Sequence, residues 1–228
     1  EFTIKINNRK ILNGLYESIN QTEKSVDIMR IIDKIDKIGD QAVMEELAKI
    51  EVPEESINKI MQFIKIDGTT DEKLQKLQSL GIENDTYKLG VEELGEVVKY
   101  IRLFGIEDKN FVIDLSIARG LDYYTGTVYE TFLNGYRELG SVCSGGRYEN
   151  LAQNYTDKKL PGVGISIGLT RLFYKLNELN LIKVEKKSIS DILIVPMTEN
   201  LQVPIKLATE LRNARVNTEI YLNEKKLK

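Results

Sequence analysis

The chain has 228 residues, of which 42% are hydrophobic and 29% charged, a composition that is ordinary for one or two globular domains. Its formal net charge of −3 gives no overall basic field, so a nucleic acid would have to be bound through a local patch or through other parts of the protein. Histidine is absent, which excludes every mechanism that needs an imidazole base, a Ser-His or Cys-His pair, or a His-ligated metal.

The first residues and the single cysteine indicate the compartment. Residues 1–6 alternate apolar and polar side chains, without a basic leader or an apolar run of membrane-spanning length, so we expect no membrane partner and a chain that begins in mid-domain. The lone Cys143 excludes an internal disulfide and a CxxC metal site, which fits a reducing compartment. We therefore expect a cytoplasmic protein with no metal site in this chain.

The first half of the chain is predicted to be a strand followed by helices. Residues 2–6 alternate with the period of a strand, and residues 10–19 place apolar side chains at helical spacing. Residues 22–104 form a polar, all-helical insert whose charge runs are solvated helix faces. The helices expected in it span residues 26–38, 42–50, 54–64, 71–80 and 89–104, with breaks at Gly39, Pro53, Gly68 and Gly81.

Strand signals dominate after residue 104. Residues 111–115, 127–133 and 139–143 are apolar runs separated by turn residues, and their spacing predicts an antiparallel meander. The elements expected next are a short helix at residues 146–155, a strand at 163–167 and a helix at 168–181. A sheet with a helix packed on it follows.

A polar linker at residues 184–188 precedes a second pattern. Residues 191–196, 201–214 and 218–222 read strand, helix, strand, which predicts one βαβ unit with a parallel pair and a right-handed crossover. Because a single unit cannot bury both faces of its sheet, we expect this second domain to be truncated.

The glycine-rich run at residues 162–168 is compatible with three kinds of site. It contains the G-x-S-x-G pattern of hydrolases, but Ser166 would need a histidine partner and the chain has none. It also resembles a dinucleotide fingerprint, but the glycines open a predicted strand instead of following one. In the third interpretation a nucleotide lies against the glycines and Arg171 holds its phosphate. A glycine-rich strand packed on a neighbour, with Arg171 at the surface, is the structural alternative.

A second cluster lies at residues 119–126. There Arg119 precedes Tyr123 and Tyr124, and a cation beside two phenols suits an aromatic ligand that carries a carboxylate or phosphate. The alternative is a salt bridge between Arg119 and Asp122 with the tyrosines packed in the core.

A third cluster, at residues 144–148, follows a predicted strand. Its glycine pair, Gly145 and Gly146, permits close approach of a ligand and is followed by an Arg-Tyr pair ending at Tyr148. Cys143 beside it is best explained as a small buried residue, since no imidazole is available to activate it. Three clusters of arginine, tyrosine and glycine so close together are not expected to be independent.

These three segments, residues 119–126, 144–148 and 162–171, resemble the two histidine-specific motifs and motif 3 of histidyl-tRNA synthetases in order and spacing. The resemblance implies an α+β fold, with part of a class II synthetase antiparallel-sheet catalytic domain, a helical insertion and the start of an α/β anticodon-binding domain. The catalytic part would comprise residues 1–21 and 105–183, the insertion domain residues 22–104, and the truncated anticodon-binding domain residues 189–228.

The resemblance also implies roles for individual residues. Arg119 would be the catalytic arginine that stabilises charge at the α-phosphate, and it would also contact histidine. The other residues of the histidine site would be Tyr123, Tyr124, Tyr148, Gly145 and Gly146. ATP would be bound by Gly164, Gly168 and Arg171, with Mg²⁺ accompanying the nucleotide.

The implied activity is a histidine–tRNA ligase, which joins L-histidine to ATP as an adenylate and transfers it to tRNA(His), as a homodimer in its full-length form. The family's motifs 1 and 2 would precede residues 2–6 and have no counterpart here, so we expect the 228-residue chain alone not to activate histidine at a meaningful rate. The alternative is a regulatory paralogue that binds histidine without charging tRNA. Such relatives tend to lose the catalytic arginine motif, which is intact here.

Overall fold

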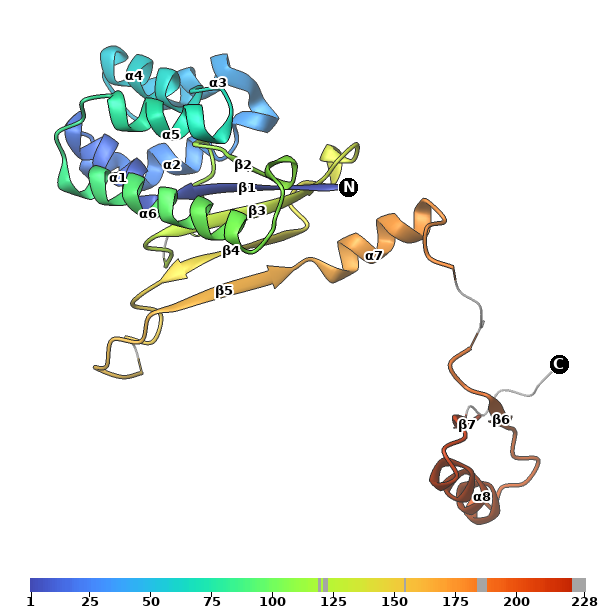
Figure 1. Cartoon of the computed structure of the whole chain (residues 1–228). Helices are drawn as coiled ribbons and strands as arrows, with labels where there is room; N and C mark the ends of the chain where they lie inside the picture. Colours follow the sequence, from blue (N-terminus) through green and yellow to red (C-terminus); the bar gives the residue numbers. More distant parts are fainter. Residues whose placement is uncertain (119, 121–122, 154, 184–187, 223–228) are drawn as a thin grey trace. The chain divides into compact units, whose positions relative to one another are not determined.

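A computed structural model of the chain describes residues 1–118, 120, 123–153, 155–183 and 188–222 (Figure 1). The chain divides into two compact units, Glu1–Tyr174 and Lys175–Lys228. The larger unit contains a five-stranded sheet and the smaller one a two-stranded sheet.

The larger sheet is mixed, with the strand order β2-β1-β3-β4-β5. Its strands are β1 (Phe2–Asn8), β2 (Phe111–Ile113), β3 (Thr127–Leu133), β4 (Cys143–Tyr148) and β5 (Gly162–Ile167). β1 runs parallel to β2 and antiparallel to β3, and the pairs β3–β4 and β4–β5 are antiparallel. β5 is an edge strand whose apolar side chains Val163, Ile165 and Ile167 are 66%, 64% and 59% exposed.

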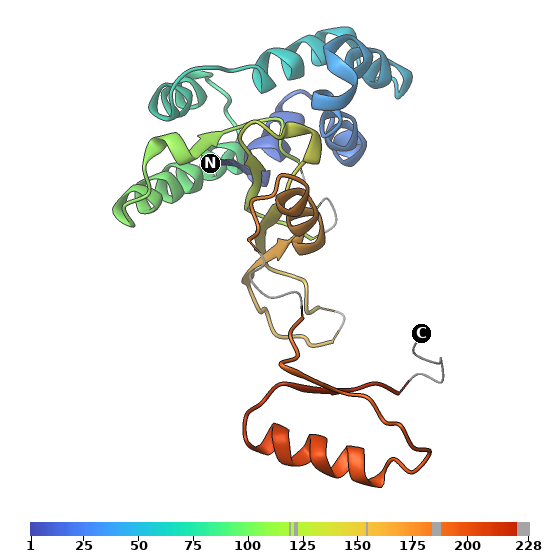
Figure 2. The same ribbon diagram turned by 90° about the vertical axis from the view of Figure 1, so that its right-hand side faces the viewer.

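Helices fill the chain between β1 and β2. They are α1 (Arg9–Ser18), α2 (Ser25–Ile32), α3 (Ile35–Lys49), α4 (Glu54–Ile64), α5 (Thr70–Ser79) and α6 (Asp85–Leu103). Single 3₁₀ turns lie at Thr22–Lys24, Asp108–Asn110 and Arg137–Leu139. In both views the helices α3 to α5 lie beyond the β2 edge of the sheet, opposite to β5 (Figures 1 and 2). One apolar core joins Ile6 of β1, Leu12 of α1 and Leu94 of α6 with the rest of the helices.

The starts of these helices follow from side-chain caps. The side chain of Asn8 accepts a hydrogen bond from the backbone N–H of Lys10 at the start of α1, and that of Asn84 accepts one from Tyr87 at the start of α6. Thr69 and Glu72 form a reciprocal capping box at the start of α5. Each cap satisfies a backbone donor that has no partner inside its helix.

The helical region agrees with the periodicity of the sequence, with one difference. The helices expected at residues 54–64, 71–80 and 89–104 correspond to α4, α5 and α6. The helix expected at residues 26–38 is instead divided, because α2 ends at Ile32 and α3 runs on through Gly39, whose φ of 79° makes a kink where a break was expected. These helices share one core with the sheet, and their assignment to a separate insertion domain stays a prediction.

Three expectations for the sheet are wrong. The strand expected at residues 139–143 begins only at Cys143, because Arg137–Leu139 form a 3₁₀ turn. The described part of residues 146–155 does not form a helix, because Gly145 and Gly146 belong to β4 and pair with β3 and β5 on either side. Glycine also disfavours a helix by about 1 kcal/mol relative to alanine. The expected meander fails at its first step, since β1 lies between β2 and β3 and pairs with both.

The remaining elements follow the sequence closely. After β5 comes α7 (Leu169–Glu178), but none of its residues is buried, contrary to the expectation of a helix packed on the sheet. The smaller unit consists of β6 (Ile192–Ile194), α8 (Gln202–Asn213) and β7 (Thr218–Ile220). β6 and β7 are parallel, so the predicted βαβ unit is confirmed.

Replacing Gly14 by alanine is expected to destabilise the larger unit. A Cβ atom at Gly14 would lie 2.4 Å from the backbone N of Tyr87, where α1 crosses α6. Backbone cannot move aside cheaply, so overpacking should lower the free energy of unfolding by about 1–3 kcal/mol. Urea unfolding followed by circular dichroism measures the change.

Gly95→Ala on α6 is the matched control. A Cβ atom there meets nothing within 4 Å. Removing a glycine from a helix interior should raise the free energy of unfolding by about 0.5–1 kcal/mol. Equal effects of the two substitutions would contradict a close crossing of α1 and α6.

Candidate functional site

Helices pack against one face of the five-stranded sheet at β1 and β2, and the opposite face carries a polar row. Cross-strand pairing places four polar residues in line across the sheet: Lys5, Glu130, Ser144 and Ser166. Because successive residues of a strand point to opposite faces, this row lies opposite to Ile6, which is buried in the core. The polar row marks the face on which the site is built.

Tyr124 and Tyr148 lie against glycine backbone on this face. A Cβ atom added to Gly146 would lie 2.8 Å from Cδ1 of Tyr124, and one added to Gly162 would lie 2.7 Å from Cζ of Tyr148. The two rings therefore occupy the space above the glycines of β4 and β5. A larger residue at either glycine would displace a ring.

The segment before β3 brings Tyr123 and Tyr124 together. Their ring centroids are 4.3 Å apart, with the planes tilted by 57°. Gly120 adopts a φ of 66°, and its carbonyl accepts a hydrogen bond of 3.0 Å from the backbone N–H of Tyr124. Arg119 and Asp122 lie outside the described residues, so the catalytic role and the alternative salt bridge expected of them both stay predictions.

The phenol of Tyr124 is held in its neutral form. Burial raises the pKa of Tyr124, and so do a hydrogen bond with Tyr123 and the nearby phenols of Tyr129 and Tyr148. A neutral phenol both donates and accepts hydrogen bonds. The cluster therefore offers aromatic surface together with polar groups that can orient a small ligand.

The predicted glycines do not all face the tyrosines. A Cβ atom on Gly145 would lie 2.1 Å from the carbonyl oxygen of Gly164, an oxygen that also accepts a hydrogen bond of 2.8 Å from the hydroxyl of Tyr129. Gly145 alternates with Gly146 and therefore points to the opposite face. Gly164 lies beside Tyr148, since its Cβ would be 3.4 Å from Cε1 of that ring.

Arg171 lies at the other end of β4 from the tyrosines. Its Nη1 donates to the carbonyl of Ser141 at 3.0 Å, and the backbone N–H of Gly168 donates to the carbonyl of Val142 at 2.8 Å. Ser141 lies five residues before Gly146 in the chain, which corresponds to at most about 17 Å between their Cα atoms. A ligand that touched both the tyrosines and Arg171 would extend along β4.

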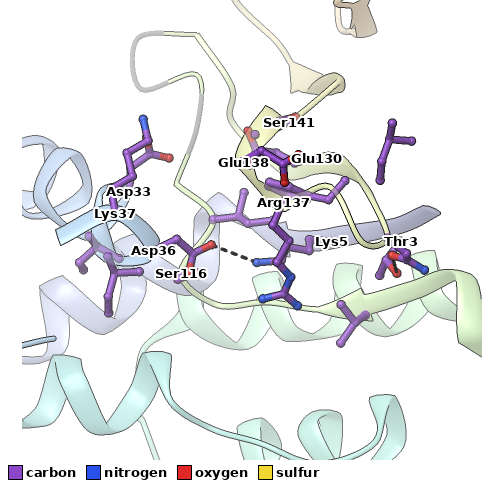
Figure 3. Close-up of a pocket in the computed structure, with 18 residues that line it drawn as sticks. Thr3, Lys5, Asp33, Asp36, Lys37, Ser116, Glu130, Arg137, Glu138 and Ser141 are labelled. Atoms are coloured by element: carbon purple, nitrogen blue, oxygen red, sulfur yellow. Dashed lines mark hydrogen bonds and ion pairs between the residues drawn. The ribbon is translucent and has the colours of Figure 1, made fainter. Parts of the chain in front are cut away.

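A cavity of about 520 Å³ opens on the polar face of the sheet, between β1, β3 and the turn that joins α2 to α3 (Figure 3). Its charged lining residues are Lys5, Asp33, Asp36, Lys37, Glu130, Arg137 and Glu138. Ser141, the partner of Arg171, also lines it. The described part of the site thus continues from the Arg171 end of β4 into a polar cavity.

Lys5 is the central charged group of this cavity. Its Nζ lies 2.7 Å from Oδ2 of Asp114 and 3.4 Å from Oδ2 of Asp36, and it sits 4.9 Å from the ring centroid of Phe132. Burial alone would lower the pKa of Lys5, but the two carboxylates raise it above its usual value. Burial would raise the pKa of Asp114, but Lys5 and a hydrogen bond from Ser116 hold it below its usual value.

The sequence interpretation missed Lys5, Asp114 and Glu130. A usable signal exists for Glu130, because it is a charged residue in the middle of the apolar strand β3 and is only 4% exposed. A charge at a buried strand position costs free energy unless it is paired, so it points to a polar site. No such signal links Lys5 to Asp114, which lie far apart in the chain.

The described residues offer neither a cluster of metal ligands nor a membrane-spanning helix. None of their cysteine, aspartate and glutamate side chains gather in groups of three or more that could hold a metal ion. Among the same residues, no helix combines the length and the apolar character needed to cross a bilayer.

Comparison with known proteins gives matches over the whole chain. The family model described as histidyl-tRNA synthetase matches residues 1–172. The histidine–tRNA ligase of Clostridium tetani is 52% identical over 228 residues, which are 100% of this chain and 52% of that protein. The crystal structure of histidyl-tRNA synthetase from Nostoc sp. PCC 7120 superposes with a TM-score of 0.79 at 43% identity, over 100% of this chain and 54% of that one.

A more distant structure shares the fold. It is described as an ATP phosphoribosyltransferase regulatory subunit/histidyl-tRNA synthetase from Bacillus halodurans C, and it matches with a TM-score of 0.64 at 18% identity, over 96% of this chain and 53% of that one. At that identity the likeness concerns the fold alone. The chain spans about half the length of the curated relatives it matches.

The Asp114→Asn variant is expected to lose stability in a pH-dependent way. The folded pKa of Asp114 is depressed, so the stability it contributes is present above its ordinary pKa of 3.8 and is lost as the pH falls through the lower folded value. At pH 7 the substitution should lower the free energy of unfolding by about 1.5–3 kcal/mol, the contribution of a hydrogen bond to a charged group. Urea unfolding at neutral pH and at successively lower pH should show this difference shrinking.

Asp27→Asn is the control for this variant. Asp27 pairs with Arg30 on the surface, where the side chains are 60% and 55% exposed. Such pairs contribute about 0–1 kcal/mol. A loss for Asp114→Asn that equals the loss for Asp27→Asn, or that does not change with pH, would contradict the role given to the Lys5–Asp114 pair.

Proposed function

This chain belongs to the histidyl-tRNA synthetase family, and we propose that the protein it forms is a histidine–tRNA ligase, which activates L-histidine with ATP and transfers it from the adenylate to tRNA(His). The observation that carries the proposal is the gathering of Tyr124 and Tyr148 over the glycines of β4 and β5. The cavity on the same face adds the space that an extended ligand requires.

Tyr123, Tyr124 and Tyr148 would form the histidine pocket, together with Gly145 and Gly146. A neutral imidazole has one N–H donor and one nitrogen acceptor, and phenol hydroxyls can serve both. The close pair of Tyr123 and Tyr124 supports this role, because it places two neutral phenols side by side. Since Gly145 points to the opposite face, it would act by letting β4 and β5 approach, not by touching histidine.

Arg119 would stabilise the negative charge that develops at the α-phosphate, where a fixed cation is worth most in a site that excludes water. Arg171 would hold the terminal phosphate, with its guanidinium oriented by the carbonyl of Ser141. Gly164 and Gly168 would flank the nucleotide. The separation between the tyrosines and Arg171 along β4 suits a ligand with an amino acid at one end and a phosphate at the other. Mg²⁺ would enter with ATP.

The half of the relatives' length that this chain does not span would complete the site. The chain spans about half of its curated relatives, and the edge strand β5 exposes Val163, Ile165 and Ile167. Residues from the other half would cover this edge and supply further contacts to ATP and histidine. Residues 22–104 would be the insertion domain and residues 189–228 would belong to the anticodon-binding domain, in a cytoplasmic homodimer. By itself the 228-residue chain would activate histidine slowly or not at all.

The alternative function, a regulatory protein that only binds histidine, is not favoured. The relative that is 52% identical is named a histidine–tRNA ligase, whereas the structure whose description mentions a regulatory subunit is 18% identical. The Arg-Gly-Leu-Asp-Tyr-Tyr sequence at residues 119–124 is also intact.

Arg119→Ala in the natural full-length protein tests the proposal. Removing one group that stabilises the transition state should lower kcat for histidine-dependent ATP–pyrophosphate exchange by about 10²–10³-fold, with smaller changes in KM. Arg30→Ala, on the exposed surface of α2, is the control and should leave kcat unchanged.

Two results would count against the proposed function. One is a full-length protein that shows no pyrophosphate exchange with histidine, and the other is an Arg119→Ala variant as active as the Arg30→Ala control. Exchange by the 228-residue chain alone at the full-length rate would show that the other half is not needed for activation.

A further inference from the structure

The turn from β1 into α1 carries three consecutive buried polar residues. Asn7 and Asn8 are 0% exposed and Arg9 is 4% exposed. Taking amide and guanidinium groups out of water costs free energy unless they are hydrogen-bonded. The partners of these side chains therefore indicate what the turn holds in place.

Asn7 holds the backbone that follows β2. Its Nδ2 donates to the carbonyl of Leu115 at 3.2 Å and to the carbonyl of Ile117 at 2.9 Å. Its Oδ1 accepts from the backbone N–H of Asn8 at 2.8 Å, which fixes which way the amide points. Both ends of the amide are used, so the side chain has one orientation.

Arg9 binds the next carbonyl of the same backbone segment. Its Nη1 donates to the carbonyl of Ala118 at 3.0 Å and contacts Sδ of Met29 at 2.8 Å. Its own backbone N–H donates to the carbonyl of Gly126 at 2.9 Å. One residue therefore holds both the start and the end of the segment between Ala118 and Gly126.

This segment is the one that carries the site. It includes Tyr123 and Tyr124, and Arg119 follows Ala118 directly in the chain. Ala118 is the last described residue before Arg119, so Arg9 anchors the chain directly before the proposed catalytic arginine.

We propose that Asn7 and Arg9 are positioning residues for the reaction: by holding the carbonyls of residues 115, 117 and 118 they set the place from which Arg119 and the tyrosines act. The inference rests on the proposed function. Both side chains are buried, so they would act without contact to the substrates. A displacement of about 1 Å in a catalytic group can cost about 10²-fold in rate, so a buried backbone clamp affects catalysis without contacting the ligand.

Asn8 provides a matched control, since it is as buried as Asn7 but faces elsewhere. Its Oδ1 accepts from the backbone N–H of Lys10 at the start of α1, and its Nδ2 donates to Oε2 of Glu93 on α6 at 2.8 Å. Asn7→Asp and Asn8→Asp make the same chemical change at adjacent buried positions. Only Asn7→Asp places a carboxylate oxygen against the carbonyls of Leu115 and Ile117.

The experiment compares these variants in the natural full-length protein. Asn7→Asp should lower kcat for histidine-dependent ATP–pyrophosphate exchange by about 10²-fold while KM for histidine and ATP changes little. Asn8→Asp should keep the kcat of the unsubstituted protein, even if it lowers the melting temperature as much as Asn7→Asp does. If Asn7→Asp does not fold, Arg9→Lys and Arg9→Met give the same test, with the lysine variant retaining more kcat because it keeps a charged donor.

Hydrogen exchange gives a second measurement that does not depend on activity. The backbone N–H groups of Tyr123 and Tyr124 both donate to the carbonyl of Gly120, and their exchange should be faster in Asn7→Asp and unchanged in Asn8→Asp. Equal kcat and equal exchange in the two variants would overturn the inference while leaving the proposed function intact. No histidine-dependent exchange of pyrophosphate by the unsubstituted protein would overturn both.

Discussion

The antiparallel pairing of β1 with β3 is the contact on which the rest of the larger unit depends. It joins strands separated by the whole helical region, and its register sets Ile6 opposite Tyr129 and Lys5 opposite Glu130. One set of side chains therefore faces the helices and the other faces the cavity. A slip of one residue would turn the apolar set outward and bury the charges, so the core and the polar face specify each other. The same register brings the backbone N–H of Arg9 to the carbonyl of Gly126, at the end of the segment that carries Tyr123 and Tyr124.

The site itself is built by placing aromatic rings on bare backbone. Tyr124 lies over Gly146 and Tyr148 lies over Gly162, so the glycines make room for the protein's own side chains as well as for a ligand. The expectation that a nucleotide lies against Gly164 and Gly168 stays a prediction. The rings also help to hold the two glycine-rich strands together. Each ring adds contact area to a strand whose glycines have no side chains to pack.

The sequence predicted what depends on neighbours in the chain. The apolar spacing of residues 54–64 was sufficient for α4, and the βαβ pattern was sufficient for the smaller unit. It failed where partners are distant: residues 146–155 were expected to be a helix, but the first of them belong to β4, which forms through its pairing with β3 and β5. For the site, the motif spacing led to Tyr124 and Tyr148. It did not lead to Lys5 or its cavity, because no short pattern connects β1 to the end of β2.

Arg9 donates hydrogen bonds to the carbonyls of both Ala118 and Gly126. These two hydrogen bonds close a loop in the chain. Closing a loop costs free energy that grows slowly with length, by about 0.6 kcal/mol for each doubling. Inserted residues would therefore add little to the cost of closing the loop, but they would move Tyr124 away from Gly146 and remove its contacts there. The length of this loop is thus set by where the tyrosine must lie, and not by the entropy of loop closure.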